Sequence, residues 1–88
     1  MNTEEAQRIL SAELEHYENK SYAELVSQVG ENLSYEKIAD DGCSYQIEIL
    51  ILWDSKSQNA IRIIGSIDDG GWRAFFPLTD STLKLPPE

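Results

Sequence analysis

The chain has 88 residues, of which 16 are acidic and 7 are basic, so its formal net charge at pH 7 is −9. Phosphate backbones and anionic lipid repel such a surface, which disfavours binding to nucleic acid or to a membrane and favours a basic protein partner or a cationic ligand. The length predicts a single domain over residues 1–88, near the size at which folding buries about two-thirds of the unfolded surface.

The single cysteine, Cys43, has no partner for an internal disulfide. The first residues contain neither the positive segment nor the apolar segment of a secretory signal. The longest apolar run, residues 49–53, is far shorter than the roughly 20 residues that cross a bilayer. We therefore expect a cytoplasmic protein that makes no contact with a membrane.

The first 30 residues contain two helical patterns. Apolar residues recur at three- and four-residue spacing behind two glutamates, which suit the first turn of a helix, and this predicts a helix over about 3–18. Ser21 and Glu24 have the spacing of a capping box, and Gly30 stands where a left-handed C-terminal cap is expected. A second helix is therefore predicted over about 22–29.

The rest of the chain alternates between apolar and polar residues, as half-buried β-strands do. Asp-Gly pairs stand in two of the connections, and this dipeptide suits turn positions with positive φ. The predicted strands cover about 33–39, 43–53, 59–68 and 72–78, and a tail follows over 79–88.

The last three predicted strands allow a specific register. Pairing Trp53 with Asn59 places Ile47 opposite Gly65, and a two-residue Asp-Gly turn then places Gly65 opposite Ala74. Both hairpins bury the same face. The two small residues Gly65 and Ala74 leave a shallow depression in that buried face, in which we expect the first helix to lie.

These patterns predict an α+β fold in which two N-terminal helices pack on one face of a four-stranded antiparallel meander sheet, with strand order 1-2-3-4. The expected core consists of Ile9, Leu10, Leu14, Leu25, Val26, Ile47, Ile49, Ile51, Ile61, Ile63, Ile67, Trp72 and Phe76.

Few residues are suited to catalysis. His16 lies in the first helix without a serine or cysteine partner at a recognisable spacing, which is typical of a surface histidine. Cys43 begins a strand without a cationic neighbour, which favours burial as a small apolar residue. Because zinc spacings, phosphate loops and nucleophile elbows are also absent from the sequence, we expect no catalytic residue and no cofactor.

Asp40, Asp41, Asp68 and Asp69 form the first candidate site. In a meander the first and third turns lie at the same end of the sheet, two strand spacings or about 10 Å apart. Their carboxylates could hold a divalent cation or attract a basic partner. Asp-Gly is also ordinary turn chemistry, and that alone explains these residues.

The face of the sheet turned away from the helices is the second candidate site. It mixes apolar and charged residues in proportions that are too apolar for a solvent-exposed face and too charged for a core, as protein interfaces often do. Two alternatives remain open: residues 79–85 fold back over this face, or the stems of Arg62 and Arg73 cover its apolar atoms and pair with Glu48. The interface candidates are Leu50, Leu52, Arg62, Ile64, Arg73 and Phe75.

Residues 44–48, the Trp53-Asp54 pair and above all residues 65–80, GSIDDGGWRAFFPLTD, resemble a family of small bacterial proteins without an assigned activity. The likeness covers roughly the C-terminal half and implies a bacterial source, but no substrate and no catalytic residue. In size, acidity and order of elements the chain is also similar to small immunity or inhibitor proteins that neutralise toxins.

We therefore hypothesise a non-enzymatic protein–protein interaction module whose partner is another protein, a basic one being favoured by charge, or a second copy of the chain. The alternatives are a toxin-neutralising protein of the immunity type and a small metal- or ligand-binding domain that uses the aspartates.

Overall fold

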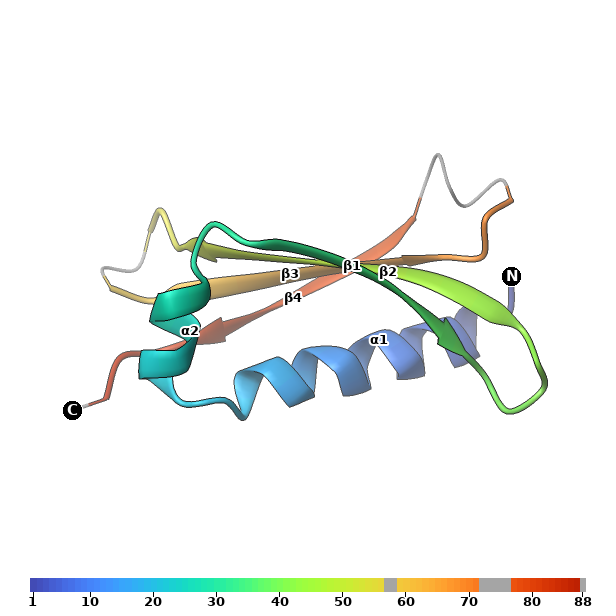
Figure 1. The fold of residues 1–88 in the computed structure, drawn as a ribbon, viewed down its shortest axis with the longest axis horizontal. Helices are drawn as coiled ribbons and strands as arrows, with labels where there is room; N and C mark the ends of the chain where they lie inside the picture. The colour runs from blue at the N-terminus through green and yellow to red at the C-terminus, as the bar shows by residue number, and fades with distance from the viewer. Residues whose placement is uncertain (57–58, 72–76, 88) are drawn as a thin grey trace.

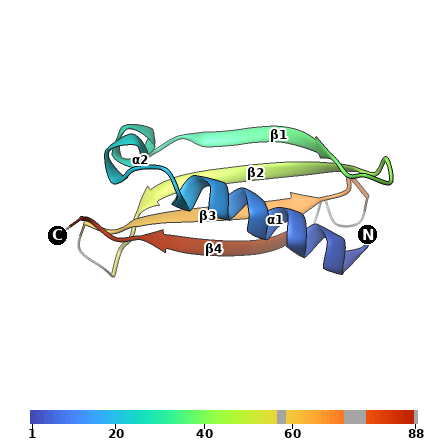
Figure 2. The ribbon, with the colours of Figure 1, turned by 90° about the horizontal axis from the view of Figure 1, so that it is seen from below.

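The computed structural model describes residues 1–56, 59–71 and 77–87 (Figure 1). Its four strands form one antiparallel sheet in the order β1-β2-β3-β4, and α1 crosses one face of that sheet (Figure 2). The predicted α+β fold and meander order are confirmed. The elements are α1 (Thr3–Glu18), α2 (Tyr22–Gln28), β1 (Asn32–Ile38), β2 (Ser44–Trp53), β3 (Ile61–Asp68) and β4 (Leu78–Lys84).

Side-chain caps determine where both helices begin. The Asn2 side chain accepts a hydrogen bond from the backbone N–H of Glu5, and the Ser21 hydroxyl accepts one from the N–H of Glu24, each at 3.1 Å. Both bonds satisfy N–H groups that lack a partner in the first turn of a helix. Gly30 follows α2 with a φ of 94°, a left-handed conformation that costs glycine little.

The core lies between α1 and the sheet. The buried residues of α1 recur at three- and four-residue spacing, and those of β2 and β3 alternate, so each element turns one apolar surface inward. Of the predicted core residues, Ile9 is only half-buried, Val26 on α2 is 38% exposed, and Trp72 and Phe76 lie outside the described residues. The buried apolar residues are Ala6, Leu10, Leu14, Tyr17, Leu25, Tyr45, Ile47, Ile49, Ile51, Ala60, Ile61, Ile63 and Ile67.

The register predicted for β2 and β3 is wrong by two residues. Trp53 pairs with Ile61 instead of Asn59, and Ile49 pairs with Gly65 instead of Ile63. Asn59 has a φ of 63°, which is a left-handed conformation incompatible with a regular strand, and it therefore belongs to the connecting loop. A slip of two residues keeps every side chain on its predicted face.

The prediction that a tail begins at residue 79 is wrong. β4 begins at Leu78, where the prediction ended, and it covers most of the expected tail, so residues 79–84 are strand. Gly65 consequently lies opposite Asp80, whereas its predicted partner Ala74 lies outside the described residues, as do all residues of 72–76. The Nε2 of Gln7 in α1 donates to Asp80 at 3.2 Å, which ties this edge strand to the helix.

Gly65 provides the depression that the helix occupies, as predicted. A Cβ atom added at this position would lie 2.8 Å from Cδ1 of Leu10 and 3.1 Å from Cδ2 of Leu14. The first distance is shorter than Cβ atoms show in proteins and the second is unusually tight, so α1 packs directly on the backbone of β3. Glycine is therefore required here for close approach and not for an unusual backbone angle.

We expect Gly65→Val to lower the free energy of unfolding by about 1–3 kcal/mol, because the added methyl groups would overpack the contact between α1 and β3. Chemical denaturation followed by circular dichroism measures this change. Ser66→Val is the matched control, since it adds a similar side chain to the same strand on the face away from α1. Equal effects of the two substitutions would contradict the close approach of the helix.

Candidate functional site: the open face of the sheet

The helices leave one face of the sheet without a covering element in the part of the chain that the structure describes (Figure 1). We call this surface the open face. Alternation along each strand determines which side chains it carries, because the buried residues of β2 and β3 point toward α1 and their neighbours point away. The described strand residues of the open face are Asn32, Ser34, Glu36, Ile38, Ser44, Gln46, Glu48, Leu50, Leu52, Arg62, Ile64, Ser66, Asp68, Thr79, Ser81 and Leu83.

Apolar residues gather at one end of the open face. Leu50 lies opposite Ile64 on the neighbouring strand, and Leu52 lies opposite Arg62, which in turn lies opposite Leu83. Direct partners across an antiparallel pair have Cβ atoms about 4.5–5.5 Å apart, so these side chains form one continuous group. All of them are half-buried. We call Leu50, Leu52, Ile64 and Leu83 the apolar end.

Arg62 is the cation beside the apolar end, and its charge is compensated within the chain. Its Nε donates to Oδ1 of Asp54 at 2.8 Å, and its guanidinium also donates to the hydroxyl of Ser81 at 3.0 Å. The side chain of Asp54 is only 7% exposed, so this ion pair is shielded from water on the aspartate side. The methylene groups of Arg62 therefore extend the apolar surface between Leu52 and Leu83.

Acidic residues occupy the other end of the open face. Glu48 lies on β2 two residues before Leu50, opposite Ser66. The next outward-facing pair, farther from the apolar end, is Gln46 and Asp68. Glu36 accepts a hydrogen bond from the side-chain amide of Gln46 at 3.3 Å. The side chain of Glu48 forms no ion pair or hydrogen bond with a described residue. The face is therefore polarised, with one apolar end and one acidic end that consists of Glu36, Glu48 and Asp68.

Four of the six predicted interface residues, Leu50, Leu52, Arg62 and Ile64, lie together on this face. The other two, Arg73 and Phe75, lie outside the described residues. Sequence reasoning missed Leu83 because it assigned residue 83 to a tail. The alternation of Leu83 with Thr82 and Lys84 was the available signal, but it extends over too few apolar residues to identify a strand.

One alternative explanation of the open face is wrong, and the other is tested only for Arg62. Residues 79–84 do not fold back over the sheet, since they form β4, its fourth strand. Arg62 pairs with Asp54 and not with Glu48. Arg73, the second arginine of that alternative, lies outside the described residues.

The four aspartates of the turns are mostly engaged by their own loops. The described residues contain no group of three histidine, cysteine or acidic side chains that could hold a metal ion. The N–H of Gly71 holds the pKa of the Asp69 carboxyl below its usual value, and the N-terminal ammonium, 3.4 Å away, acts in the same direction. Three of the four turn aspartates accept a hydrogen bond from the backbone N–H of the residue two positions later: Asp41 from Cys43 at 2.9 Å, Asp68 from Gly70 at 2.8 Å and Asp69 from Gly71 at 3.2 Å.

His16 and Cys43 have no catalytic environment in the described structure. The His16 ring packs edge-to-face on Tyr17, with ring centroids 5.7 Å apart. Cys43 is exposed, so its predicted burial is wrong. The negative charge of Asp41 raises the pKa of the Cys43 thiol above its ordinary value, and this disfavours the reactive thiolate.

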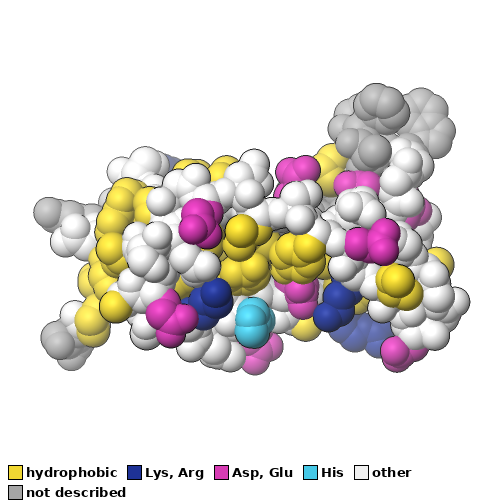
Figure 3. Space-filling view, viewed as in Figure 1, with side chains coloured by type: hydrophobic (Ala, Val, Ile, Leu, Met, Phe, Trp, Pro, Cys, Tyr) yellow, Lys and Arg dark blue, Asp and Glu magenta, His cyan; other side chains and the backbone are white. Residues whose placement is uncertain are grey.

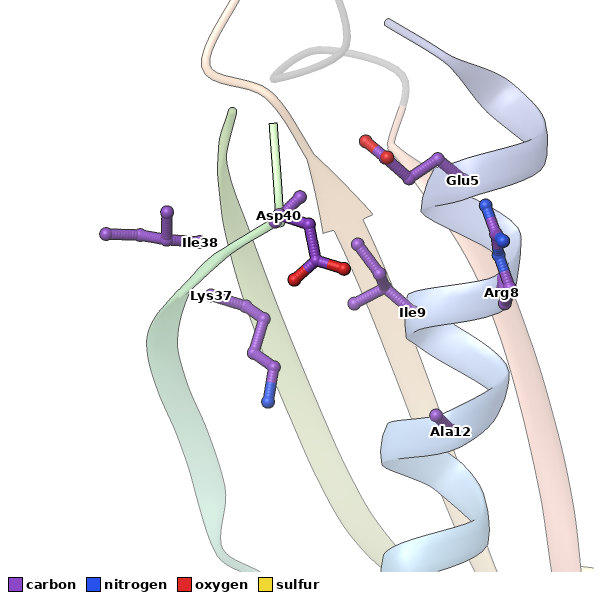
Figure 4. A pocket seen from close by; sticks show the side chains of 8 residues that line it. Glu5, Arg8, Ile9, Ala12, Lys37, Ile38 and Asp40 are labelled. Atoms are coloured by element: carbon purple, nitrogen blue, oxygen red, sulfur yellow. The ribbon is translucent and has the colours of Figure 1, made fainter. Parts of the chain in front are cut away.

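A groove of about 320 Å³ lies between α1 and the end of β1 (Figure 4). Charged side chains line it from both walls: Glu5 and Arg8 from the helix, and Lys37 and Asp40 from the strand and its turn. Ile38 points away from it in Figure 4, whereas Ile9, Ala12 and Ala39 are its other apolar lining residues. A ligand pocket usually has a predominantly apolar lining, whereas half of the residues that line this groove are charged.

No protein-family model, curated protein sequence or solved structure matches the chain. The likeness of residues 65–80 to small bacterial proteins therefore stays a prediction. Among the described helices, none is both long enough and apolar enough to cross a membrane.

Proposed function

We propose that this protein is a non-enzymatic interaction module that binds another protein through the open face of its sheet. The cross-strand pair of Leu50 and Ile64 carries this proposal, because two large apolar side chains stand half-buried on a face that no described element covers. Burying such a group against a partner is favourable by about 25 cal/mol for each Å² of apolar surface removed from water.

The distribution of polar groups supports the same proposal. Protein interfaces combine an apolar part, which partners bury, with polar and charged groups beside it, and the open face has both. The turn hydrogen bonds of the aspartates favour this function over a cation site at the end of the sheet, since they give Asp41, Asp68 and Asp69 a structural role.

Chemical cross-linking in a native lysate tests the proposal with Leu50→Asp and Ile64→Asp. We expect each substitution to remove a specific cross-linked species that the unchanged protein forms, because a buried carboxylate without a partner strongly disfavours an apolar interface. Val26→Asp is the matched control, because it places the same charge at an exposed apolar residue of α2.

Circular dichroism of each variant shows whether the fold survives, and only folded variants are compared. The proposal fails if folded Leu50→Asp and Ile64→Asp proteins form the same cross-linked species as the unchanged chain, or if Val26→Asp removes those species equally well.

A further inference from the structure

We infer that the partner segment bound by the open face is a basic amphipathic helix, with apolar residues at one end of its contact stripe and lysine or arginine at the other. This inference rests on the proposed function and adds the chemistry and the secondary structure of the partner. The polarised charge of the face and the hydrogen bonding of its central strands carry it.

The backbone of the open face favours a helix over an extended peptide. β2 and β3 each pair with a strand on both sides, so their backbone N–H and C=O groups are used inside the sheet. An extended peptide would have to leave its own backbone groups unpaired against this face, since strand addition takes place at edges. A helix satisfies its backbone internally, and packing a helix on a sheet is a standard way to cover an apolar face.

Charge complementarity determines the sign of the charge that the partner segment carries. Among the described strand residues of the open face the acids are Glu36, Glu48 and Asp68, and the one base, Arg62, is already paired with Asp54. Glu48 stands next to the apolar end without a partner of its own among the described residues. A cation placed there would gain an interaction, whereas an acidic helix would meet carboxylates of like charge. The net charge of −9 acts in the same direction at long range.

The spacing of the face matches the repeat of a helix. Residues two apart on a strand, such as Leu50 and Glu48, are separated by about 6.6–6.8 Å. Residues four apart on a helix are separated by about 6 Å. A helix laid along β2 would therefore place apolar side chains at i and i+4 over the apolar end, and basic side chains at i+8 and i+11 over the acidic end.

A pair of synthetic peptides tests the inference with the full chain. Both peptides are 18-residue helices with leucine at i, i+3 and i+4, and they differ only in carrying either lysine or glutamate at i+7, i+8 and i+11. Amide NMR titration reports both the affinity and the residues affected. We expect the lysine peptide to bind at least about tenfold more tightly, to weaken with added salt, and to shift the amides around Leu50 and Ile64.

Two variants separate a local charge contact from general attraction. Glu48→Lys should weaken binding of the lysine peptide about fivefold or more, because it replaces an attraction at the contact by a repulsion. Glu15→Lys changes the net charge by the same amount at an exposed position of α1, on the other side of the sheet, and should change binding much less.

The inference is overturned if the glutamate peptide binds as tightly as the lysine peptide, if Glu48→Lys and Glu15→Lys have equal effects, or if the shifted amides lie along α1. Its failure is distinguishable from failure of the proposed function. If Leu50→Asp removes the cross-linked species while Glu48→Lys does not alter it, the interface stands and only the basic character of the partner is rejected.

Discussion

Leu10→Ala is expected to lower the free energy of unfolding by about 2–5 kcal/mol, the range for truncating a fully buried leucine. Leu10 is completely buried in the middle of α1, and the position a Cβ atom would take on Gly65 lies only 2.8 Å from its Cδ1 atom. Its removal therefore leaves a cavity between helix and sheet. A domain of this size has about 5–15 kcal/mol of stability in total, so the loss is a large share of it.

Thermal and chemical unfolding both measure this effect, and the midpoint temperature should fall by at least about 8 °C. Leu85→Ala is the control, because Leu85 is 63% exposed and its truncation should change stability by less than about 0.5 kcal/mol. A double variant with Gly65→Ala adds a second check. The added methyl group should be better tolerated when Leu10 has been truncated than when the full leucine side chain is present, with a coupling of about 0.5–3 kcal/mol.

The second large effect is a loss of stability at alkaline pH, caused by Tyr45. The buried Tyr45 hydroxyl donates to the Glu5 carboxylate at 2.8 Å. This bond, with burial, raises the pKa of Tyr45 from 10.0 to about 12. A pKa raised by folding means that the stabilisation is complete below pH 10 and is lost as the pH rises through about 12. Tyr35 acts in the same direction, because burial and its bond to Glu13 raise its pKa.

Urea unfolding at pH 8 and at pH 11 measures this dependence, and Tyr45→Phe should reduce the difference between them. At pH 8 the same variant should cost about 1–2 kcal/mol, because a hydrogen bond to a charged group is lost. Tyr22→Phe serves as the control, since the Tyr22 hydroxyl donates to the backbone carbonyl of Asn59 and not to a carboxylate. An unchanged pH dependence in Tyr45→Phe would contradict the role given to this bond.

The helices could be predicted closely from sequence because their signals are local. The cap at Ser21, the periodic apolar stripe of α1 and the glycine after α2 all act within one or two turns of helix. The space-filling view, which looks at the edge of the sheet and the side of α1, shows charged side chains of both signs and the single histidine over the region of α1 (Figure 3).

The positions of the strands were harder to predict, since pairing depends on segments far apart in the chain. Aromatic residues favour strands, and this preference selected residues 72–78 over the more polar sequence of β4. As an edge strand, β4 needs few apolar residues. Two hydrogen bonds also tie it to α1: Gln7 donates to Asp80, and the Lys84 ammonium donates to the backbone carbonyl of Glu18 at 2.9 Å.

The candidate site could be predicted only in part for the same reason. Alternation identified Leu50, Leu52, Arg62 and Ile64 as residues of the face away from the helices. The addition of Leu83, and the pairing of Arg62 with Asp54, depend on which residues of different strands become neighbours. The separation of the face into an apolar end and an acidic end became visible only once those neighbours were known.

By itself, the sequence determined the α+β class, the helix ends, the meander order and the inward or outward direction of the side chains of β2 and β3, because caps and period-two alternation act locally. Only the tertiary structure decided the register and the position of β4. A shift of two residues preserves every inward and outward direction, so alternation cannot detect it. The left-handed conformation of Asn59 and the contact of α1 with Gly65 distinguish the actual pairing from its alternatives.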